Sequence, residues 1–148
     1  MARSLDKSPT HLMHRVLQCA NNVFQAEQKN ADLTPRQISV LLTVARNQGL
    51  SQTGIVERTG IDRSTLADIV RRLQKKGLLH RSRTREDARA YAVKLTGEGE
   101  RILRVAEPVM QRVDARIIGA LPERERDKLL SALKAIVGAL ESKPMSRA

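Results

Sequence analysis

The stretch from Leu50 to Leu95 constrains the fold of this chain more than any other part of the sequence. Ser51 and Asp62 are expected to cap a short helix over residues 52–58 and a second helix over 63–76, which Gly77 ends, and a turn that contains Gly60 joins the two. The second helix is expected to bury Leu66, Ile69, Val70 and Leu73. Hairpin strands are expected over residues 78–83 and 91–95, the latter with Tyr91, Val93 and Leu95 alternating against Ala92 and Lys94. Two helices joined by a glycine-containing turn and followed by a hairpin indicate a helix-turn-helix with a wing.

The segments on both sides predict further helices. Residues 1 to about 8 are expected to be loose. Apolar residues recur at helical spacing after Pro9, after Pro35, after Thr96 and after Pro122, and a kink is expected near 104–108 because Pro108 lies inside the third of these helices. Thr34 and Gln37 are expected to form a capping box for the second helix, and Thr96 to cap the third. The expected apolar stripe of the third helix is Ile102, Val105, Ala106, Val109, Met110, Val113 and Ile117. The apolar stripes of the first and last helices have little core to cover in one small chain, which indicates a homodimer interface. We therefore predict a mainly α (α+β) fold, a winged helix-turn-helix with a two-stranded wing plus terminal dimerisation helices. The expected boundaries are one domain over 1–148, dimerisation helices over 9–30 and 100–141, and the winged helix-turn-helix region over 34–96.

The charge of the chain is unevenly distributed. Its 27 lysines and arginines against 16 acidic residues give a net charge of +11, and residues 61–95 contribute six of these charges, from ten basic and four acidic residues. Such an excess favours a polyanion, either nucleic acid or an anionic membrane surface. Phe24 and Tyr91 are the only aromatic residues, too few to stack on single strands, so double-stranded DNA is the expected partner.

The cysteine content and the apolar runs predict the compartment. Cys19 is the only cysteine, so no intramolecular disulfide is expected, as suits a reducing cytoplasm. No apolar run approaches the roughly 20 residues of a membrane helix. We expect a cytoplasmic protein without a membrane partner.

Several short motifs follow one another in a characteristic order: Leu33-Thr34-Pro35, Gly60-Ile61-Asp62-Arg63-Ser64-Thr65-Leu66, Arg71-Arg72-Leu73, Lys76-Gly77-Leu78-Leu79, Asp87-Ala88-Arg89 and Leu95-Thr96-Gly97-Glu98-Gly99. Together they resemble the MarR family of winged helix-turn-helix transcriptional regulators. The resemblance implies a homodimer with a reader helix in the major groove and an arginine-tipped wing in the minor groove. It also implies a ligand-responsive regulator, expected here to be a repressor that binds a pseudo-palindromic operator.

The candidate DNA-binding residues form three groups. Arg63, Ser64 and Thr65 lie in the first turn of the reader helix, where arginine suits guanine and hydroxyls suit bases or phosphate. The preceding helix begins with hydroxyls and amides that suit phosphate, and cations near the wing suit a narrow minor groove or phosphates. The alternative for each group is simple capping or a solvated charged surface. The second group is Ser51, Gln52 and Thr53, and the third is Arg71, Arg72, Arg81, Arg83, Arg85 and Arg89. The resemblance also implies that Asp87 braces the wing and that Arg89 is the cation inserted into the groove or placed against the backbone.

An effector is implied by the resemblance, because family members bind a small molecule, often an anionic aromatic, between the dimer helices and the winged domain. The surplus of cations suits an aromatic acid or its acyl-coenzyme A thioester. Candidate contacts are His11, Arg15, Gln18, Arg36 and Arg46.

Other functions have weaker support. A redox sensor acting through Cys19 and a nonspecific basic architectural DNA-binding protein stay open as alternatives. His11 and His14 lie one helical turn apart, but no acid or cysteine completes a metal site, so neither metal nor cofactor is expected. An enzyme is not expected, since no nucleophile triad, phosphate loop or pair of catalytic carboxylates emerges.

Overall fold

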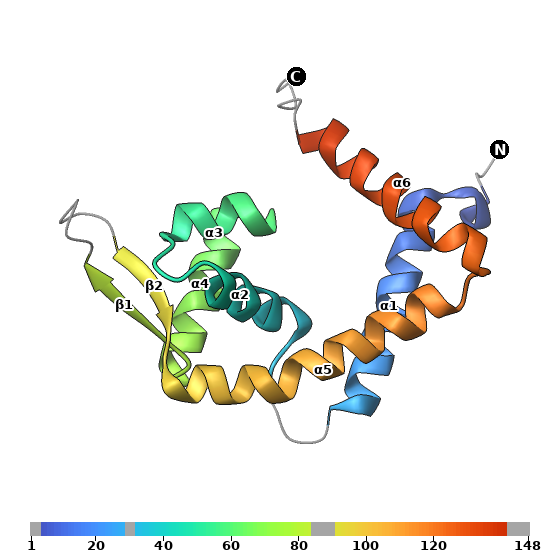
Figure 1. The fold of residues 1–148 in the computed structure, drawn as a ribbon. Helices are drawn as coiled ribbons and strands as arrows, with labels where there is room; N and C mark the ends of the chain where they lie inside the picture. Colours follow the sequence, from blue (N-terminus) through green and yellow to red (C-terminus); the bar gives the residue numbers. More distant parts are fainter. Residues whose placement is uncertain (1–3, 29–31, 84–90, 142–148) are drawn as a thin grey trace.

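A computed structural model describes residues 4–28, 32–83 and 91–141 of the chain (Figure 1). Six α-helices and one two-stranded sheet make up this part of the protein, so the predicted mainly α fold with a two-stranded wing is confirmed. A short 3-10 turn also occurs near the N-terminus, where the sequence predicted loose chain. In order, the elements are η1 (Leu5–Lys7), α1 (Pro9–Glu27), α2 (Pro35–Arg46), α3 (Gln52–Thr59), α4 (Arg63–Lys75), β1 (Leu79–Arg83), β2 (Tyr91–Leu95), α5 (Gly97–Gly119) and α6 (Glu123–Glu141).

The helix boundaries follow from local capping. Thr34 and Gln37 form a complete capping box at the start of α2, and Pro35 takes the first helical position. Gly60 ends α3 with φ +70, a left-handed conformation that glycine adopts without steric cost. The remaining side-chain caps, each accepting from a backbone amide, are Ser8 for α1, Ser51 for α3, Asp62 for α4 and Thr96 for α5.

The hydrophobic core lies between α2, α3, α4, the sheet and α5, with Phe24 added from the end of α1. The apolar stripe predicted for α4 is fully confirmed, because Leu66, Ile69, Val70 and Leu73 are all buried. In α5 the prediction was partly wrong. Val105, assigned to the stripe, is 56% exposed, whereas Leu103 is buried, because α5 presents different sides to the core along its length.

The wing is antiparallel, with Leu79 opposite Leu95 and Arg83 opposite Tyr91. Strict alternation along β2 was expected and is not observed, since Ala92 is buried beside Val93 and Tyr91 is exposed. A further backbone pairing joins Leu50 to Val93, whose amide donates to the Leu50 carbonyl over 2.8 Å. This bridge ties the chain before α3 to the wing, and the hairpin pattern alone did not indicate it.

Helix α5 connects two parts of the molecule that lie at its opposite ends (Figure 1). The sheet and α2–α4 lie at its N-terminal end, whereas α1 and α6 lie toward its C-terminal end. Pro108 lies inside α5, which stays one continuous helix as predicted, and its axis changes direction along its length in Figure 1. None of the described helices has the length and apolar character needed to cross a membrane.

Candidate nucleic-acid interface and ligand pockets

The N-terminal turns of α3 and α4 come together on the surface. The guanidinium Nη1 of Arg63 donates to the hydroxyl of Thr53 over 3.4 Å, which joins one residue from each of two predicted DNA-binding groups. Ser51 holds the start of α3 by accepting from the amide of Gly54 over 3.1 Å. Both helices therefore direct their N-terminal ends, with their exposed polar groups, to the same region.

The first turn of α4 is held by Asp62. This carboxylate accepts from the amide of Thr65 over 3.0 Å and from the hydroxyl of Ser64 over 2.8 Å. Hydrogen bonding by Thr65 and then by Ser64 lowers the pKa of Asp62 from 3.8 to about 2. Ser64 and Thr65 thus have a capping role, the alternative weighed for them from the sequence, while Arg63 stays exposed beside them.

Gln52 lies in the first turn of α3. Its side-chain nitrogen is buried and has no hydrogen-bond partner among the described residues. An unpaired buried amide is costly, because the nitrogen has lost its hydration without gaining a hydrogen bond.

The wing presents cations, of which Arg81 and Arg83 are described and exposed. The guanidinium of Arg83 lies 5.8 Å from the ring centre of Tyr91, a cation–π contact across the last residue pair of the two strands. Arg85, Asp87 and Arg89 lie outside the described residues, so their roles stay predictions.

Arg71 and Arg72 do not join the group at the N-terminal end of α4. Both pair with Asp68, whose pKa is lowered by the hydrogen bond from Arg71 and the neighbouring charges. They lie in the C-terminal half of α4, beside the start of α2, where they line a separate pocket of about 480 Å³.

A second pocket, of about 490 Å³, lies between α1, α5 and α6. Its lining is mainly apolar and includes Arg15, Arg116 and Cys19. Arg15 was a predicted ligand contact. Arg116 was missed, although a cation directly before the apolar Ile117 could have signalled it. The complete lining is Leu12, Arg15, Val16, Cys19, Arg116, Ile117, Ala120, Leu121 and Leu129.

The other predicted ligand contacts lie away from this pocket. Gln18 donates to Asn22 on the same helix over 3.0 Å, and Arg46 pairs with Glu107 of α5 over 3.5 Å. Arg36 is exposed on α2, and His11 is half-buried in the first turn of α1. The predicted cluster is therefore not formed within one chain. No group of three metal-ligating side chains is placed to hold a metal within the described ranges.

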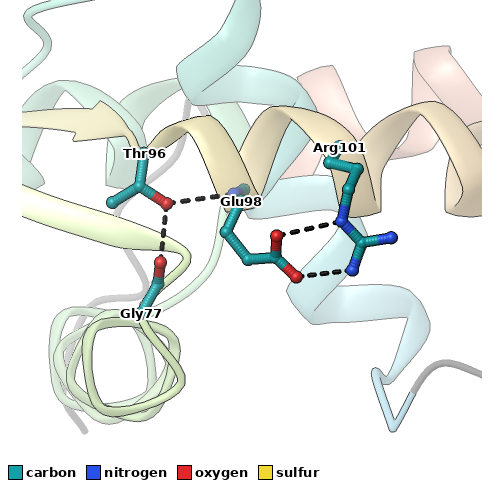
Figure 2. A network of polar contacts seen from close by, with 5 residues as sticks. Gly77, Thr96, Glu98 and Arg101 are labelled. Carbon is teal, nitrogen blue, oxygen red and sulfur yellow. Dashed lines mark hydrogen bonds and ion pairs between the residues drawn. The ribbon is translucent and has the colours of Figure 1, made fainter.

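We call α2, α3, α4 and the two strands the reading region. The contact between the end of α4 and the start of α5 joins this region to the long helix α5 (Figure 2). The hydroxyl of Thr96 donates to the carbonyl of Gly77 over 2.6 Å and accepts from the amide of Gly99 over 3.0 Å. Glu98 and Arg101 pair over 2.9 Å on the next turn. A Cβ at Gly99 would lie only 2.1 Å from the Leu78 carbonyl oxygen, so this position requires glycine.

These features define a winged helix-turn-helix DNA-binding protein. Residues 31–90 match the profile that describes the MarR family. The transcriptional regulator HosA of Escherichia coli O111:H- is 32% identical over 108 residues, which are 73% of this chain and 80% of HosA. The chain belongs to the MarR family of transcriptional regulators.

Solved structures agree with this assignment over nearly the whole chain. The PcaV regulator of Streptomyces coelicolor in complex with its natural ligand superposes with a TM-score of 0.87 at 29% identity, covering 95% of this chain and 99% of PcaV. BpsR of Bordetella bronchiseptica, whose DNA binding is regulated by 6-hydroxynicotinic acid, gives a TM-score of 0.85 at 25% identity, covering 93% of this chain and 98% of BpsR.

Proposed function

We propose that this regulator is a cytoplasmic, homodimeric repressor that binds a pseudo-palindromic duplex operator and is released by a small anionic aromatic effector. The observation that carries the DNA-binding part is the convergence of the exposed N-terminal turns of α3 and α4, with Arg63 hydrogen-bonded to Thr53. Arg63 and the paired hydroxyls of Ser64 and Thr65 would meet base edges and phosphates, and Ser51, Gln52 and Thr53 the backbone. The wing residues Arg83, Arg85 and Arg89 would add minor-groove and phosphate contacts, with Asp87 bracing the hairpin.

The homodimer is supported by unpaired apolar surface. Helix α6 has 19 residues and none of them is buried, and α1 exposes Leu12, Val16 and Leu17 next to it. A helix with a long exposed apolar stripe is stable only if another surface covers it. A second copy would cover both helices and place two reader helices one DNA turn apart, roughly 34–36 Å.

The dimer can be tested by placing a charge in the stripe of α6. Ile136→Asp is expected to raise the dimer dissociation constant by about a hundredfold, because an unpaired carboxylate would be buried at the interface. Ser131→Asp adds the same charge at an exposed position of the same helix and serves as the control. Sedimentation of both variants measures the effect, and a wild-type monomer at micromolar concentration would contradict the homodimer.

The effector part is supported by the pocket between α1, α5 and α6. Its apolar lining suits an aromatic ring, and Arg15 and Arg116 are among the lining residues, so their guanidinium groups would need only to turn toward the pocket to meet a carboxylate. An acid that binds a dimer spacing unfit for DNA would release the operator in proportion to that preference. BpsR, regulated by 6-hydroxynicotinic acid, offers the precedent of an aromatic acid in a structurally similar protein.

DNA binding is tested by titrating labelled duplexes, obtained by selection from a random pool, at fixed salt. Arg63→Ala and Arg89→Ala are each expected to weaken binding by about tenfold or more with unchanged thermal stability. Arg124→Ala, which removes an exposed cation from α6, is the matched control. Affinity that is equal for selected and random duplexes would instead favour the nonspecific architectural protein.

The effector is tested with 6-hydroxynicotinic acid, benzoate and their coenzyme A thioesters in a thermal-shift and DNA-release assay. Arg15→Gln should abolish the response to an active acid, whereas Arg36→Gln, which removes a cation away from the pocket, should keep it. If none of the acids acts and Cys19→Ser removes a response to peroxide, the redox alternative replaces the aromatic effector.

A further inference from the structure

The pocket at Arg71 and Arg72, formed by the start of α2 and the end of α4, plays no part in the proposed reading of DNA bases or in the proposed aromatic site. It measures about 480 Å³ and shares no lining residue with the pocket at Arg15. Its volume lies in the range of roughly 300–1,000 Å³ that is usual for small-molecule sites. Its lining is polar: Asp32, Thr34, Gln37, Arg71, Arg72, Lys75 and Lys76.

Four cations line one side of this pocket in two rows along α4. Arg71 lies one turn before Lys75, and Arg72 one turn before Lys76, so each row places like charges four residues apart, an arrangement that destabilises a helix. Asp68 pairs with both arginines, and Lys76 pairs with Asp32 over 3.6 Å. Two acids therefore face four cations, and a positive excess of two is left for a bound anion.

Uncharged donors face the same space from α2. Gln37 is only 8% exposed, yet it lines the pocket. Its side-chain oxygen accepts a hydrogen bond from the backbone amide of Thr34 over 3.0 Å. The hydroxyl oxygen of Thr34 accepts from the amide of Gln37 over 3.2 Å. Within the described part of the chain, no hydrogen bond is donated by the Gln37 side-chain nitrogen or by the Thr34 hydroxyl, so both remain as donors.

We propose that this pocket binds a small phosphate-bearing anion with at least two negative groups. Lys75, Lys76, Arg71 and Arg72 would neutralise its charge, and Gln37 and Thr34 would donate to its oxygens. A concave site suits a small molecule better than a DNA backbone, which meets protruding side chains. The pocket residues on α4, from Arg71 to Lys75, also lie about 12 to 18 Å along the helix from Arg63, at a rise of roughly 1.5 Å per residue. The occupant would touch Lys76, next to Gly77 of the α4–α5 junction.

The test uses sodium pyrophosphate as the probe in calorimetric titrations of the full chain at constant ionic strength. Saturable binding of one pyrophosphate per chain is expected, weakened by about tenfold in the double variant Lys75→Gln/Lys76→Gln. Lys128→Gln/Lys134→Gln removes the same charge from α6 and should bind as the wild type does. Absence of saturable binding, or equal loss in both double variants, overturns the proposal.

A DNA arm separates the two sources of phosphate. The salt dependence of duplex binding is measured for wild type and for Lys75→Gln/Lys76→Gln. An unchanged slope together with lost pyrophosphate binding supports a free small anion. A slope reduced by about two would assign the lysines to the DNA backbone and overturn the proposal. The Lys75→Gln/Lys76→Gln variant keeps Arg63, and pyrophosphate binding is measured without DNA, so failure of this proposal is distinguishable from failure of the proposed function.

Discussion

The reading region of this protein and its terminal helices differ in how they satisfy their apolar residues. Helices α2, α3 and α4 and both strands each bury side chains in a shared core, in which Leu41, Ile55 and Leu66 are fully buried. Helix α6 carries a stripe of similar apolar content and buries none of it, and Leu140 is 72% exposed. A similar sequence pattern therefore produces a core in one region and an open surface in the other.

The difference teaches that hydrophobic periodicity specifies which side of a helix must be covered, but not by which chain. In the reading region, short turns at Gly60 and Gly77 return the chain from α3 to α4 and from α4 to β1. After α5 the chain instead turns back as α6, which buries none of its residues, although Glu141 at its end lies near Gly60 (Figure 1). The reading region is stable through its own contacts, and we infer that the terminal helices depend on a partner.

The largest effect is expected at the junction that joins the two regions. Gly99→Ala would place a Cβ 2.1 Å from the carbonyl oxygen of Leu78, a backbone atom that cannot move aside alone. We expect a loss of more than about 4 kcal/mol in the free energy of unfolding. Gly97→Ala, in the same turn with nothing within 4 Å of the added Cβ, should leave stability unchanged or slightly higher. Denaturant unfolding measures both, and equal stability of the two variants would show that the junction is loosely packed.

A smaller effect separates the core from the open surface directly. Leu66→Ala removes a fully buried side chain and should cost about 3 kcal/mol at every protein concentration. Leu133 is 39% exposed in one chain. Leu133→Ala should lower the free energy of unfolding by about 1 kcal/mol, and this loss should change with protein concentration. Thermal unfolding over a dilution series checks this. A Leu133→Ala effect independent of concentration would mean that α6 is covered within its own chain.

The smallest effect concerns the cap of the reader helix. Because the pKa of Asp62 is lowered from 3.8 to about 2, its contribution to stability is present above pH 3.8 and is lost as pH falls toward 2. The stability of the wild type should therefore fall more steeply over this interval than that of Asp62→Asn, which has no charge to lose. Unfolding monitored by circular dichroism at several pH values provides the measurement, and identical profiles would show that the cap does not depend on charge.

Much of the reading region could be predicted from the sequence because its signals are local. Thr34, Ser51, Asp62 and Thr96 cap helices where expected, and α4 begins at Arg63 as predicted and ends at Lys75, one residue before the predicted end. Caps and glycine turns act over a few residues, so the groups that interact are close together in the sequence and can be recognised from it. The hydrogen bond between Arg63 and Thr53 was not predicted and is a finding of the structure.

The pockets could not be predicted in this way, since their residues come from distant segments. Arg15 was named as a ligand contact, but Arg116 was not, because the approach of α5 to α1 depends on how the whole core packs. Likewise Gln37 was recognised only as half of a capping box, and its position beside Lys75 and Lys76 depends on the packing of α2 against α4.

The sequence by itself determined the elements, their caps, the apolar stripe of α4 and the concentration of positive charge around the wing, since each follows from residues close together in the chain. Only the tertiary structure decided which cations share a pocket, which carboxylates neutralise them, and that α6 leaves its apolar stripe open. These properties depend on distances between segments far apart in sequence, and such distances are set by the packing of the complete core.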